Sequence, residues 1–385
     1  MKMTRKEVLE EILKIPNNNI VLELPTGFGK TRSALELAKK WNTKTLLIVV
    51  SRVVHKSNWE DEINKWWPNN QATITMTTYY SLHKYAGEYD TVILDEAHHT
   101  TERSIELLQG YSFKHAVMLS ATINKETKWA LGTLFPNLYV YKKTLRDAID
   151  DEILPDPTIY LYPLQLDNTK RTEEIWFNKN LKGTPITLEF KYKWYYKKYN
   201  RPVKIVCTPC QYYNDLNSKI EFYKNKFMIC RSEIIKNKWL HLCSERLTWL
   251  ASKKLSVVKT LLKKYENSRT LTFCNNIEHT EILGKYCINS KNKDAIKNLE
   301  DFNAGKINHI TACNMLNESV NLVNCQIGIY GNLNSSEIIV KQRIGRLLRH
   351  KNPIIIIPYF KNTRDEELVN KMKEDYNEEL IHVMQ

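Results

Sequence analysis

The stretch Pro25-Thr26-Gly27-Phe28-Gly29-Lys30-Thr31 decides the fold, because it joins an apolar run to a helix-like stretch. The apolar run is Ile20–Leu24, and the helix-like stretch is Thr31–Lys40. A glycine loop between a strand and a helix points backbone N–H groups and a helix N-terminus at phosphate. In such a loop Lys30 reaches the β- and γ-phosphates, and the Thr31 hydroxyl binds Mg²⁺. The stretch therefore predicts a nucleoside triphosphate site.

A second string, Asp95-Glu96-Ala97-His98-His99, ends another apolar run, Thr91–Leu94. In this position Asp95 would hold the Mg²⁺ shell and Glu96 would polarise the attacking water. Each string alone has a simpler explanation. The first is a plain glycine turn, since Leu24 stands where the full phosphate-loop pattern has a glycine, and the second is a solvated acidic helix start. Both strings at strand ends, in this order, favour triphosphate hydrolysis.

Two further strings extend the pattern, Ser120-Ala121-Thr122 and Gln342-Arg343-Ile344-Gly345-Arg346-Leu347-Leu348-Arg349. In chain order the four strings resemble motifs I, II, III and VI of superfamily 2 helicases and translocases. The DEAH-type second string is most similar to the DNA-repair, restriction and phage-helicase group. Weaker resemblances to motifs Ia, Ib, IV and V lie at Val50-Ser51-Arg52 with Trp59, Thr77-Thr78-Tyr79, Thr272-Phe273-Cys274-Asn275 and Glu318-Ser319-Val320-Asn321-Leu322. The resemblance spans about residues 4–150 and 255–360.

This resemblance implies two RecA-like domains with ATP and Mg²⁺ bound between them. Arg346 and Arg349 lie three residues apart, on one face of a helix, and would act as arginine fingers. Gln342 would position the water or contact the γ-phosphate, and Asn321 would contact the nucleotide. A basic surface helix that only binds phosphate or solvent is the simpler explanation of the arginines. His98 would link the ATP site to motif III, with the partners Ser120 and Thr122.

The chain departs from the family pattern in three places. Superfamily members often carry an upstream glutamine that reads adenine, and here Arg5 and Glu7 stand near that place. Motif V usually has glycine where Ser319 stands and often aspartate where Asn321 stands. The first departure weakens the inference of adenine selectivity. The other two place in doubt the coupling between ATP and nucleic acid in the second domain.

The predicted fold class is α/β, with two RecA-like doubly wound parallel-sheet domains and an inserted segment in the second. Strand-like runs alternate with helical stretches, which predicts parallel sheets. The first domain spans residues 1–150, and its strands are Ile20–Leu24, Leu46–Val50, Thr73–Met76, Val92–Asp95 and Ala116–Leu119. The second comprises residues 151–167 and 255–363, and its strands are Ile159–Tyr162, Thr270–Phe273, His309–Ala312, Gln326–Tyr330 and Pro353–Pro358. Residues 364–385 form an acidic, helix-like tail.

The inserted segment, residues 168–254, carries most of the excess charge. It holds 19 Lys and Arg against 7 Asp and Glu, so it supplies +12 of the chain's net charge of +14. It also holds 15 of the 40 aromatic residues, and cations alternate with rings around Lys193, Trp194, Lys197 and Lys198. Cations neutralise phosphates and rings stack on unpaired bases, so the segment predicts a nucleic-acid grip. The alternative is a small β-meander with lysines on its wet face.

The nucleic acid would also contact Arg52 and Thr78 in the first domain and Asn275 in the second. Because phosphate contacts carry no sequence information, movement along the strand should be largely sequence-independent. The resemblance favours DNA, single-stranded or branched, over RNA. Three alternatives remain: an RNA helicase or remodeller, a binding protein with a vestigial ATP site, and the motor subunit of a restriction or defence complex. A protein partner is left open.

Composition limits the cellular setting. No apolar run approaches the roughly 18–20 residues that span a bilayer. The N-terminus lacks an apolar signal core and predicts a helix with a Thr4/Glu7 capping box. We therefore expect an intracellular, cytoplasmic protein with reduced thiols, encoded by a phage or mobile element. Zinc binding by Cys207, Cys210, Cys230 and Cys243 is the alternative, although their spacing is irregular and lacks a second C-x-x-C.

Overall fold

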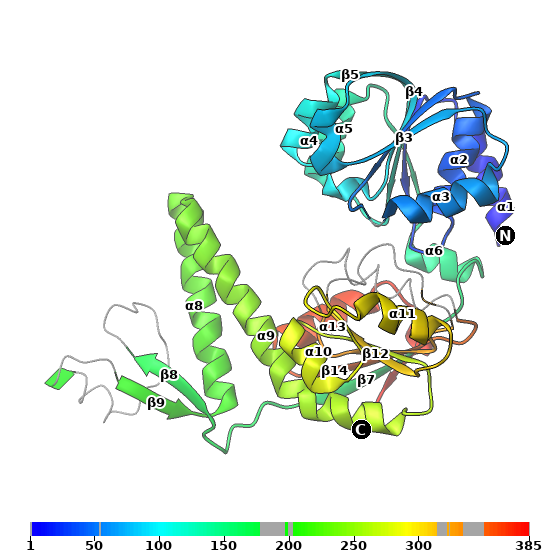
Figure 1. The fold of residues 1–385 in the computed structure, drawn as a ribbon. Helices are drawn as coiled ribbons and strands as arrows, with labels where there is room; N and C mark the ends of the chain where they lie inside the picture. Colours follow the sequence, from blue (N-terminus) through cyan, green and yellow to red (C-terminus); the bar gives the residue numbers. More distant parts are fainter. Residues whose placement is uncertain are drawn as a thin grey trace.

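The structure is a computed structural model that describes residues 2–53, 55–177, 197–198, 203–313, 322, 324–333 and 350–384. Within these residues the chain forms two parallel sheets of six and seven strands and a two-stranded antiparallel sheet. Helices flank the two large sheets, and a pair of long helices stands beside the second domain (Figure 1). The predicted α/β class with two RecA-like sheets is confirmed.

The first sheet has the strand order β3-β2-β4-β5-β1-β6, and every pairing is parallel. In β2 the sequence TLLIVV has five buried residues out of six, as expected for a strand covered on both faces. The short edge strand β6 was not predicted, because its YVYK sequence is only partly buried and shows no apolar run. The strands are β1 (Asn19–Glu23), β2 (Thr45–Val50), β3 (Thr73–Thr78), β4 (Gly87–Leu94), β5 (Tyr111–Ser120) and β6 (Tyr139–Lys142).

The helices of the first domain begin at side-chain caps in several places. The predicted capping box is present, because Thr4 accepts a hydrogen bond from the Glu7 N–H and Glu7 accepts one from the Thr4 N–H. Such a box satisfies two otherwise unpaired donors at the helix start. The elements are α1 (Arg5–Lys14), α2 (Lys30–Lys40), α3 (His55–Trp66), η1 (Tyr79–Lys84), η2 (Ala97–His99), α4 (Glu102–Leu108), α5 (Lys125–Leu134) and α6 (Leu145–Asp150).

The second sheet has the strand order β11-β12-β10-β13-β14-β7-β15, again with parallel pairing. The Ile159–Tyr162 run belongs to this sheet as predicted, since Ile159 pairs with Ile355. The strands are β7 (Thr158–Leu164), β10 (Thr270–Phe273), β11 (Cys287–Ile288), β12 (His309–Ala312), β13 (Ile327–Tyr330), β14 (Ile354–Phe360) and β15 (Ile381–Val383). The helices here are α10 (Ile277–Leu283), α11 (Ala295–Asn303), α13 (Arg364–Lys373) and the short η3 (Glu378–Leu380).

The C-terminal tail is not one helix, which corrects the prediction for residues 364–385. The helix α13 ends at Lys373, and β15 then adds to the edge of the second sheet beside β7. The Met384 N–H donates to the Leu161 carbonyl at 2.8 Å and continues this pairing. Three of the seven acidic residues of the tail, Asp365, Glu366 and Glu367, lie in the first turn of α13, where they complement the helix dipole. The apolar residue Ile381 packs against the core.

The segment between β7 and β10 is mainly a helical hairpin, and the predicted boundary at residue 254 falls inside a helix. A small sheet of β8 (Glu173–Phe177) and β9 (Val203–Cys207) precedes α8 (Pro209–Cys230) and α9 (Glu233–Lys264). A β-meander is therefore absent from the described part of this segment. The two helices run side by side and extend away from the second sheet (Figure 1). Neither α9 nor any other described helix has the long apolar stretch needed to cross a membrane.

Candidate nucleotide-binding site

The glycine loop lies between β1 and α2, at the carboxyl edge of the first sheet. Gly27 and Gly29 have φ values of 86° and 108°, in the left-handed region that side-chain-bearing residues rarely adopt. Phe28 is buried, and its N–H donates to the Pro25 carbonyl at 3.3 Å, which closes the turn. Gly29 is the N-cap of α2 and supplies no side-chain cap. The first N–H groups of α2 are therefore available to an anion.

Lys30 points from the start of α2 toward the end of β4. Its ammonium lies 3.9 Å from Oε1 of Glu96. Within the described residues, the buried Lys30 Nζ has no hydrogen-bond partner, and neither has the buried hydroxyl of Thr26. Buried polar groups are almost always hydrogen-bonded, so two unsatisfied groups in one loop fit a site for an anionic ligand. Thr31 lies in the first turn of α2 and lines the same cavity.

Asp95 and Glu96 follow β4 directly and bring two carboxylates to the same edge. Oδ2 of Asp95 accepts the indole N–H of Trp59 at 2.9 Å, and Oδ1 accepts the Glu96 N–H at 3.0 Å. Burial and the adjacent Glu96 carboxylate raise the pKa of Asp95 above its usual value, although Trp59 and Lys30 oppose the shift. Burial and the neighbouring charge destabilise these carboxylates in their charged form, and a hard divalent cation would compensate them. The residues present therefore fit Mg²⁺.

His98 connects this edge to the end of β5. Its Nδ1 lies 3.4 Å from Oε2 of Glu96 and 3.0 Å from Oγ of Ser120. The Ser120 hydroxyl donates to the Thr122 carbonyl at 2.8 Å and accepts the Thr122 N–H at 3.3 Å. Because the single hydroxyl hydrogen of Ser120 goes to Thr122, Nδ1 of His98 is the donor in its contact with Ser120. The structure thus brings all three predicted coupling residues together.

Lys30, Thr31 and the two carboxylates line one cavity of about 980 Å³, whereas His98, Ser120 and Thr122 are not among its lining residues. Its lining includes the glycine loop, Asp95, Glu96 and residues of α3. Arg5 also lines it and donates to the carbonyls of Gly27 at 3.5 Å and Ile153 at 2.9 Å. Arg5 therefore joins the glycine loop to the segment that leads into the second domain. Glu7, the other residue near the position of the family's adenine motif, is used in the cap of α1.

Several predicted site residues lie outside the described part of the chain, and no geometry is assigned to them. They are Gln342, Arg346 and Arg349 of the motif VI string, Ser319 and Asn321 of motif V, and Lys193 and Trp194 of the basic segment. His350 and Lys351, which directly follow the motif VI string in sequence, are described and line the cavity.

The predicted nucleic-acid contacts differ in exposure. Arg52, at the end of β2, is exposed, and so are Lys197 and Lys198. Thr78 is 7% exposed, and its hydroxyl accepts the Ser81 N–H at the start of η1. Asn275 donates to Thr248 of α9 at 2.5 Å and accepts from Asn332 at 2.7 Å. The Thr78 and Asn275 side chains therefore already have partners within the protein.

Sequence reasoning missed two aromatic residues that hold the acidic string in place. Trp59 was noted only beside motif Ia, yet its indole N–H donates to Asp95. The Tyr79 hydroxyl donates to the backbone carbonyl of Asp95 at 3.0 Å, and burial raises the pKa of Tyr79. No local pattern signals either contact, because the partners are 36 and 16 residues apart.

The four cysteines considered for zinc do not gather at one point. Cys210 and Cys230 lie near opposite ends of α8, a helix of 22 residues that is about 33 Å long. All eight cysteines of the chain are free thiols in this structure. In the described residues no three His, Cys, Asp or Glu side chains are grouped in a way that could hold an ion. The alternative of a single zinc site at these four residues is therefore incompatible with the fold.

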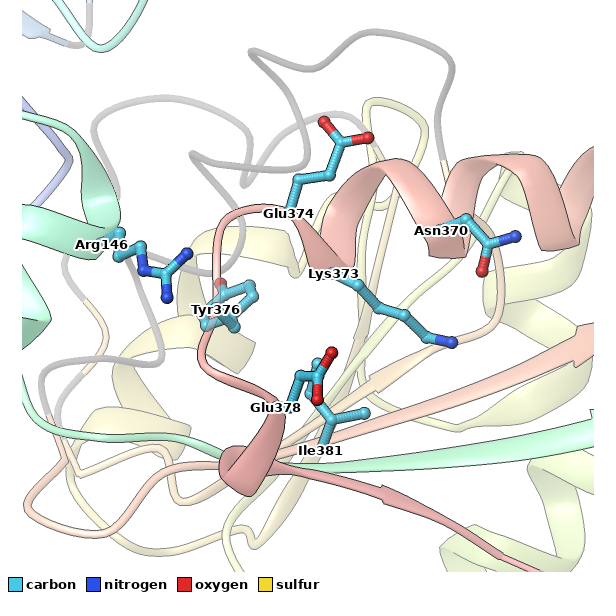
Figure 2. Close-up of a pocket in the computed structure, with 7 residues that line it drawn as sticks. All are labelled: Arg146, Asn370, Lys373, Glu374, Tyr376, Glu378 and Ile381. Carbon is cyan, nitrogen blue, oxygen red and sulfur yellow. The ribbon is translucent and has the colours of Figure 1, made fainter.

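A second cavity, of about 710 Å³, contains none of the motif residues. Figure 2 shows Arg146 facing Tyr376 and the residues of α13, with Glu378 and Ile381 below them. Beside this cavity, Arg146 donates to the Asn377 side chain at 2.5 Å, and Asn377 donates to Asp150 at 3.1 Å. These contacts join α6 to the turn before η3. The cavity is thus a junction between the end of the first domain and the C-terminal tail.

Comparison with protein families matches both halves of the chain. Residues 2–125 match the family described as type III restriction enzyme, res subunit, and residues 253–351 match the helicase conserved C-terminal domain. The first match covers the glycine loop and the acidic string. The second covers the motif IV to motif VI region.

Three known proteins are similar in sequence. "Putative helicase 161L" of Invertebrate iridescent virus 6 is 27% identical over 38% of this chain and 37% of its own length. "Probable helicase D10" of Escherichia phage T5 is 25% identical over 43% of this chain and 41% of its own length. The chain thus spans well under half of these two relatives. The "DNA 3'-5' translocase XPB2" of Sulfurisphaera tokodaii is 22% identical over 92% of this chain and 80% of its own length.

Two solved structures share the fold. The helicase domain of Pyrococcus furiosus Hef aligns with a TM-score of 0.55 and 14% identity, covering 96% of this chain and 97% of that one. Dbp5 of S. cerevisiae, bound to RNA and ADP BeF3, aligns with a TM-score of 0.59 and 11% identity, covering 100% and 89%. At such identities the likeness extends to the two-domain fold alone.

Proposed function

The chain is a member of the superfamily 2 helicases, and from this premise we propose that it is an ATP-driven motor that moves along or unwinds DNA. The observation that carries the proposal is the buried ammonium of Lys30, which has no hydrogen-bond partner in the described residues. It lies 3.9 Å from Glu96, at the mouth of a glycine loop whose helix start is uncapped. This arrangement suits the phosphates of a nucleotide.

In the proposed reaction each part of the first-domain site has one task. The loop from Pro25 to Gly29 would bind phosphate oxygens through backbone N–H groups, and Lys30 would neutralise their charge. Thr31 and Asp95 would hold Mg²⁺, whose role is to screen the triphosphate. Glu96 would orient the attacking water and accept its proton. Trp59 and Tyr79 would keep Asp95 in place.

The second domain would complete the site. Arg346 and Arg349 would stabilise the charge that spreads over the γ-phosphate oxygens, while Gln342 and Asn321 would contact the nucleotide or its water. Closing of the domains would bring these groups to the first-domain site, and opening would follow hydrolysis. His98 is suited to transmit this change, because it contacts both Glu96 and Ser120. A strand held by both domains would be moved by each cycle.

We propose DNA as the substrate because XPB2, the relative that aligns over most of the chain, carries the name of a DNA translocase. RNA is the second candidate, since the structurally similar Dbp5 was solved with RNA. The first domain's match to a restriction enzyme res subunit also favours a motor subunit that works with a partner. The viral and phage relatives favour a phage or mobile-element origin.

ATP hydrolysis is the first test, measured without polynucleotide and with single-stranded DNA, forked DNA and RNA. We expect strong stimulation by DNA. Glu96→Gln should lower kcat by about 10²–10⁴-fold, because it removes the group that accepts the proton. Glu88→Gln is a matched control, because Glu88 is an exposed carboxylate at the other end of the same strand, β4.

The outcomes separate the candidates. Stimulation by RNA alone would replace the DNA motor with the RNA helicase. Equal losses in Glu96→Gln and Glu88→Gln would contradict the assignment of Glu96. No hydrolysis under any condition would overturn the motor itself and favour a vestigial binding protein or a subunit that needs its partner.

A further inference from the structure

The two parallel-sheet domains are joined by a short connection. In the described residues the chain passes once from the first sheet to the second, between β6 and β7. The first domain extends to Ile153, whose carbonyl accepts from Arg5 of α1, and the second sheet begins at Thr158, whose N–H donates to the Pro353 carbonyl at 2.9 Å. The stretch Leu154-Pro155-Asp156-Pro157 lies between them, and its prolines restrict the backbone. Residues 154–157 are therefore the hinge between the domains.

The helix α6 lies on the first-domain side of this hinge. Directly after α6, Asp151 accepts the Met3 N–H at 3.1 Å and lies 3.4 Å from the Lys143 ammonium. The Leu154 N–H donates back to the Ala148 carbonyl of α6 at 2.9 Å. These contacts tie α6 to the N-terminal segment and to the residue that follows β6. We therefore expect α6 to move with the first sheet.

The turn before η3 lies on the second-domain side of the hinge. Tyr376, in this turn, is buried. After the turn, β15 pairs with β7 of the second sheet, where Ile381 is the partner of Ile159. The helix that precedes the turn, α13, packs on β14 of the same sheet. Asn377, which follows Tyr376, is therefore fixed to the second sheet from both directions of the chain.

Asn377 binds α6 through both polar atoms of its amide. Its Oδ1 accepts from Arg146 at 2.5 Å, and its Nδ2 donates to Oδ1 of Asp150 at 3.1 Å. Arg146 and Asp150 lie one helical turn apart, and Nε of Arg146 is 4.0 Å from Oδ2 of Asp150. The amide thus meets a donor and an acceptor that match it. These hydrogen bonds connect the two domains directly, a few residues from the hinge.

The contact is polar and accessible to water. The side chains of Arg146 and Asp150 are each 51% exposed. Arg146 also lines the cavity of about 710 Å³, and Figure 2 shows it on one side of this space with α13 on the other. Exposed hydrogen bonds contribute little net stability, because water replaces them when they break. Such a contact can open and form again at low cost, whereas packed apolar side chains would have to be exposed to water.

We propose that Asn377, Arg146 and Asp150 form a latch that holds the two domains in one orientation and opens in each cycle of the motor. The proposal rests on the proposed function, which it deepens by naming a contact that regulates domain movement. An ATP-driven motor needs at least two orientations of its domains. Because the latch spans the hinge, its hydrogen bonds are made in only one of them. The latch therefore adjusts the free-energy difference between the orientations, and ligands that favour the other orientation must break it.

The test joins positions 146 and 377 covalently. The variant carries Arg146→Cys and Asn377→Cys in a background with Cys230→Ser, because Cys230 is the exposed one among the eight cysteines. A short bismaleimide that contains a reducible disulfide links the introduced thiols. Mass spectrometry of proteolytic peptides measures the yield for the protein alone and with a non-hydrolysable ATP analogue and single-stranded DNA. Each single-cysteine variant, treated in the same way, is the matched control for the lost side chain and for reaction at other thiols.

We expect the yield of the cross-link to differ about tenfold between the protein alone and the complex with both ligands, because the contact is made in one orientation only. Once linked, the double variant should lose DNA-stimulated hydrolysis by about tenfold or more, since the domains can no longer change their angle. Binding of the ATP analogue at the glycine loop should persist. Reduction of the linker should restore hydrolysis, and the treated single variants should hydrolyse ATP as before treatment.

Three results would overturn the latch. Equal yields with and without the ligands would show that positions 146 and 377 stay together, so that α6 moves with the second domain. Full hydrolysis by the linked protein would show that the contact need not open. A loss of hydrolysis that also appears in the treated single variants would assign the effect to another thiol. Failure of the motor proposal is distinct, because the unlinked protein would then not hydrolyse ATP with any polynucleotide, while the yields still report whether the contact opens.

Discussion

Two carboxylates of this protein each accept a hydrogen bond from a tryptophan, yet their pKa values shift in opposite directions. Asp95 accepts an indole N–H from Trp59 at 2.9 Å, and Glu173, at the base of the hairpin, accepts one from Trp249 at 2.9 Å. Burial and a second carboxylate raise the pKa of Asp95. Burial acts in the same direction on Glu173, but hydrogen bonds from Lys253, Trp249 and Thr172 outweigh it and lower the pKa of Glu173.

The difference lies in what completes each cluster. Lys253 donates directly to Glu173. Lys30, in contrast, is 3.9 Å from Glu96, and its buried ammonium makes no hydrogen bond in the described residues. The hairpin base is therefore electrostatically complete within the chain. The first-domain site remains incomplete and costs stability, which a cation and an anionic ligand would recover on binding.

The strongest way to break the comparison is to remove the cation from a buried, ion-paired carboxylate, so that it resembles Asp95. Lys254 of α9 donates to Asp365 of α13 at 2.8 Å, and both side chains are 1% exposed. Lys254→Met would leave Asp365 buried without its cation. We expect the free energy of unfolding, measured by urea titration, to fall by about 3–5 kcal/mol.

Lys259→Met is the control for this prediction, because Lys259 is exposed on the same helix. It should change the free energy of unfolding by less than about 0.5 kcal/mol. Similar losses in the two variants would mean that the buried pair does not anchor the hairpin to the second domain.

The same substitution at the two tryptophans tests whether the Asp95 and Glu173 clusters have different roles. Trp59→Phe and Trp249→Phe each remove an indole N–H from a carboxylate. Trp59→Phe should weaken the Mg²⁺ dependence of nucleotide binding by about 10- to 100-fold, as is typical when the partner of a metal ligand is lost. Trp249→Phe should leave Mg²⁺ dependence unchanged and lower the free energy of unfolding by about 2 kcal/mol.

Binding of a fluorescent ATP analogue at increasing Mg²⁺ concentration measures the first effect, and urea titration measures the second. If Trp249→Phe altered Mg²⁺ dependence as much as Trp59→Phe, the assignment of Mg²⁺ binding to the Asp95 cluster alone would be wrong. An effect of Trp59→Phe on unfolding alone would make its indole purely structural.

The first-domain site could be predicted from sequence because its residues follow strands that the sequence marks clearly. Apolar runs such as Leu46–Val50 are buried on both faces, and polar residues directly after them must meet at one sheet edge. Local pattern therefore places the glycine loop, Asp95 and Glu96 at this edge, whereas the link between His98 and Ser120 was implied by the family resemblance. The support from Trp59 could not be predicted, because a helix residue finds its partner only after the chain has folded.

The hairpin shows where local pattern is insufficient. The sequence predicted a nucleic-acid grip or a small β-meander for residues 168–254, yet α8 and α9 are helices that pack on each other through rings such as Tyr212 and Trp239. The capping box of Thr208 and Gln211, with Pro209 at the helix start, was the available signal. The edge strand β15 escaped prediction because three residues carry too little pattern, and its pairing partner, β7, is distant in sequence.

The smallest effect concerns how the two carboxylates respond to pH. The folded-state pKa of Glu173 is lowered, so its contribution to stability is present above the ordinary glutamate value and is lost as pH falls through the lowered value. Glu173→Gln should therefore lower the free energy of unfolding by about 1 kcal/mol at pH 7, since Lys253 is partly exposed to solvent. The gap between variant and parent should stay constant down to the ordinary glutamate pKa of 4.5 and close as the pH falls below it.

Asp95→Asn is the matched variant in the first-domain site, and its sign is opposite. Because the pKa of Asp95 is raised in the folded protein, its carboxylate costs stability at pH 7, and the cost disappears as pH falls and the group is protonated. The variant should be more stable than the parent at pH 7 without Mg²⁺, while nucleotide binding with Mg²⁺ is weakened. Urea titrations of both variants from about pH 3 to pH 8 would reveal the two slopes. Slopes of the same sign would mean that the first-domain carboxylates are compensated within the chain, leaving no electrostatic cost for a bound cation to relieve.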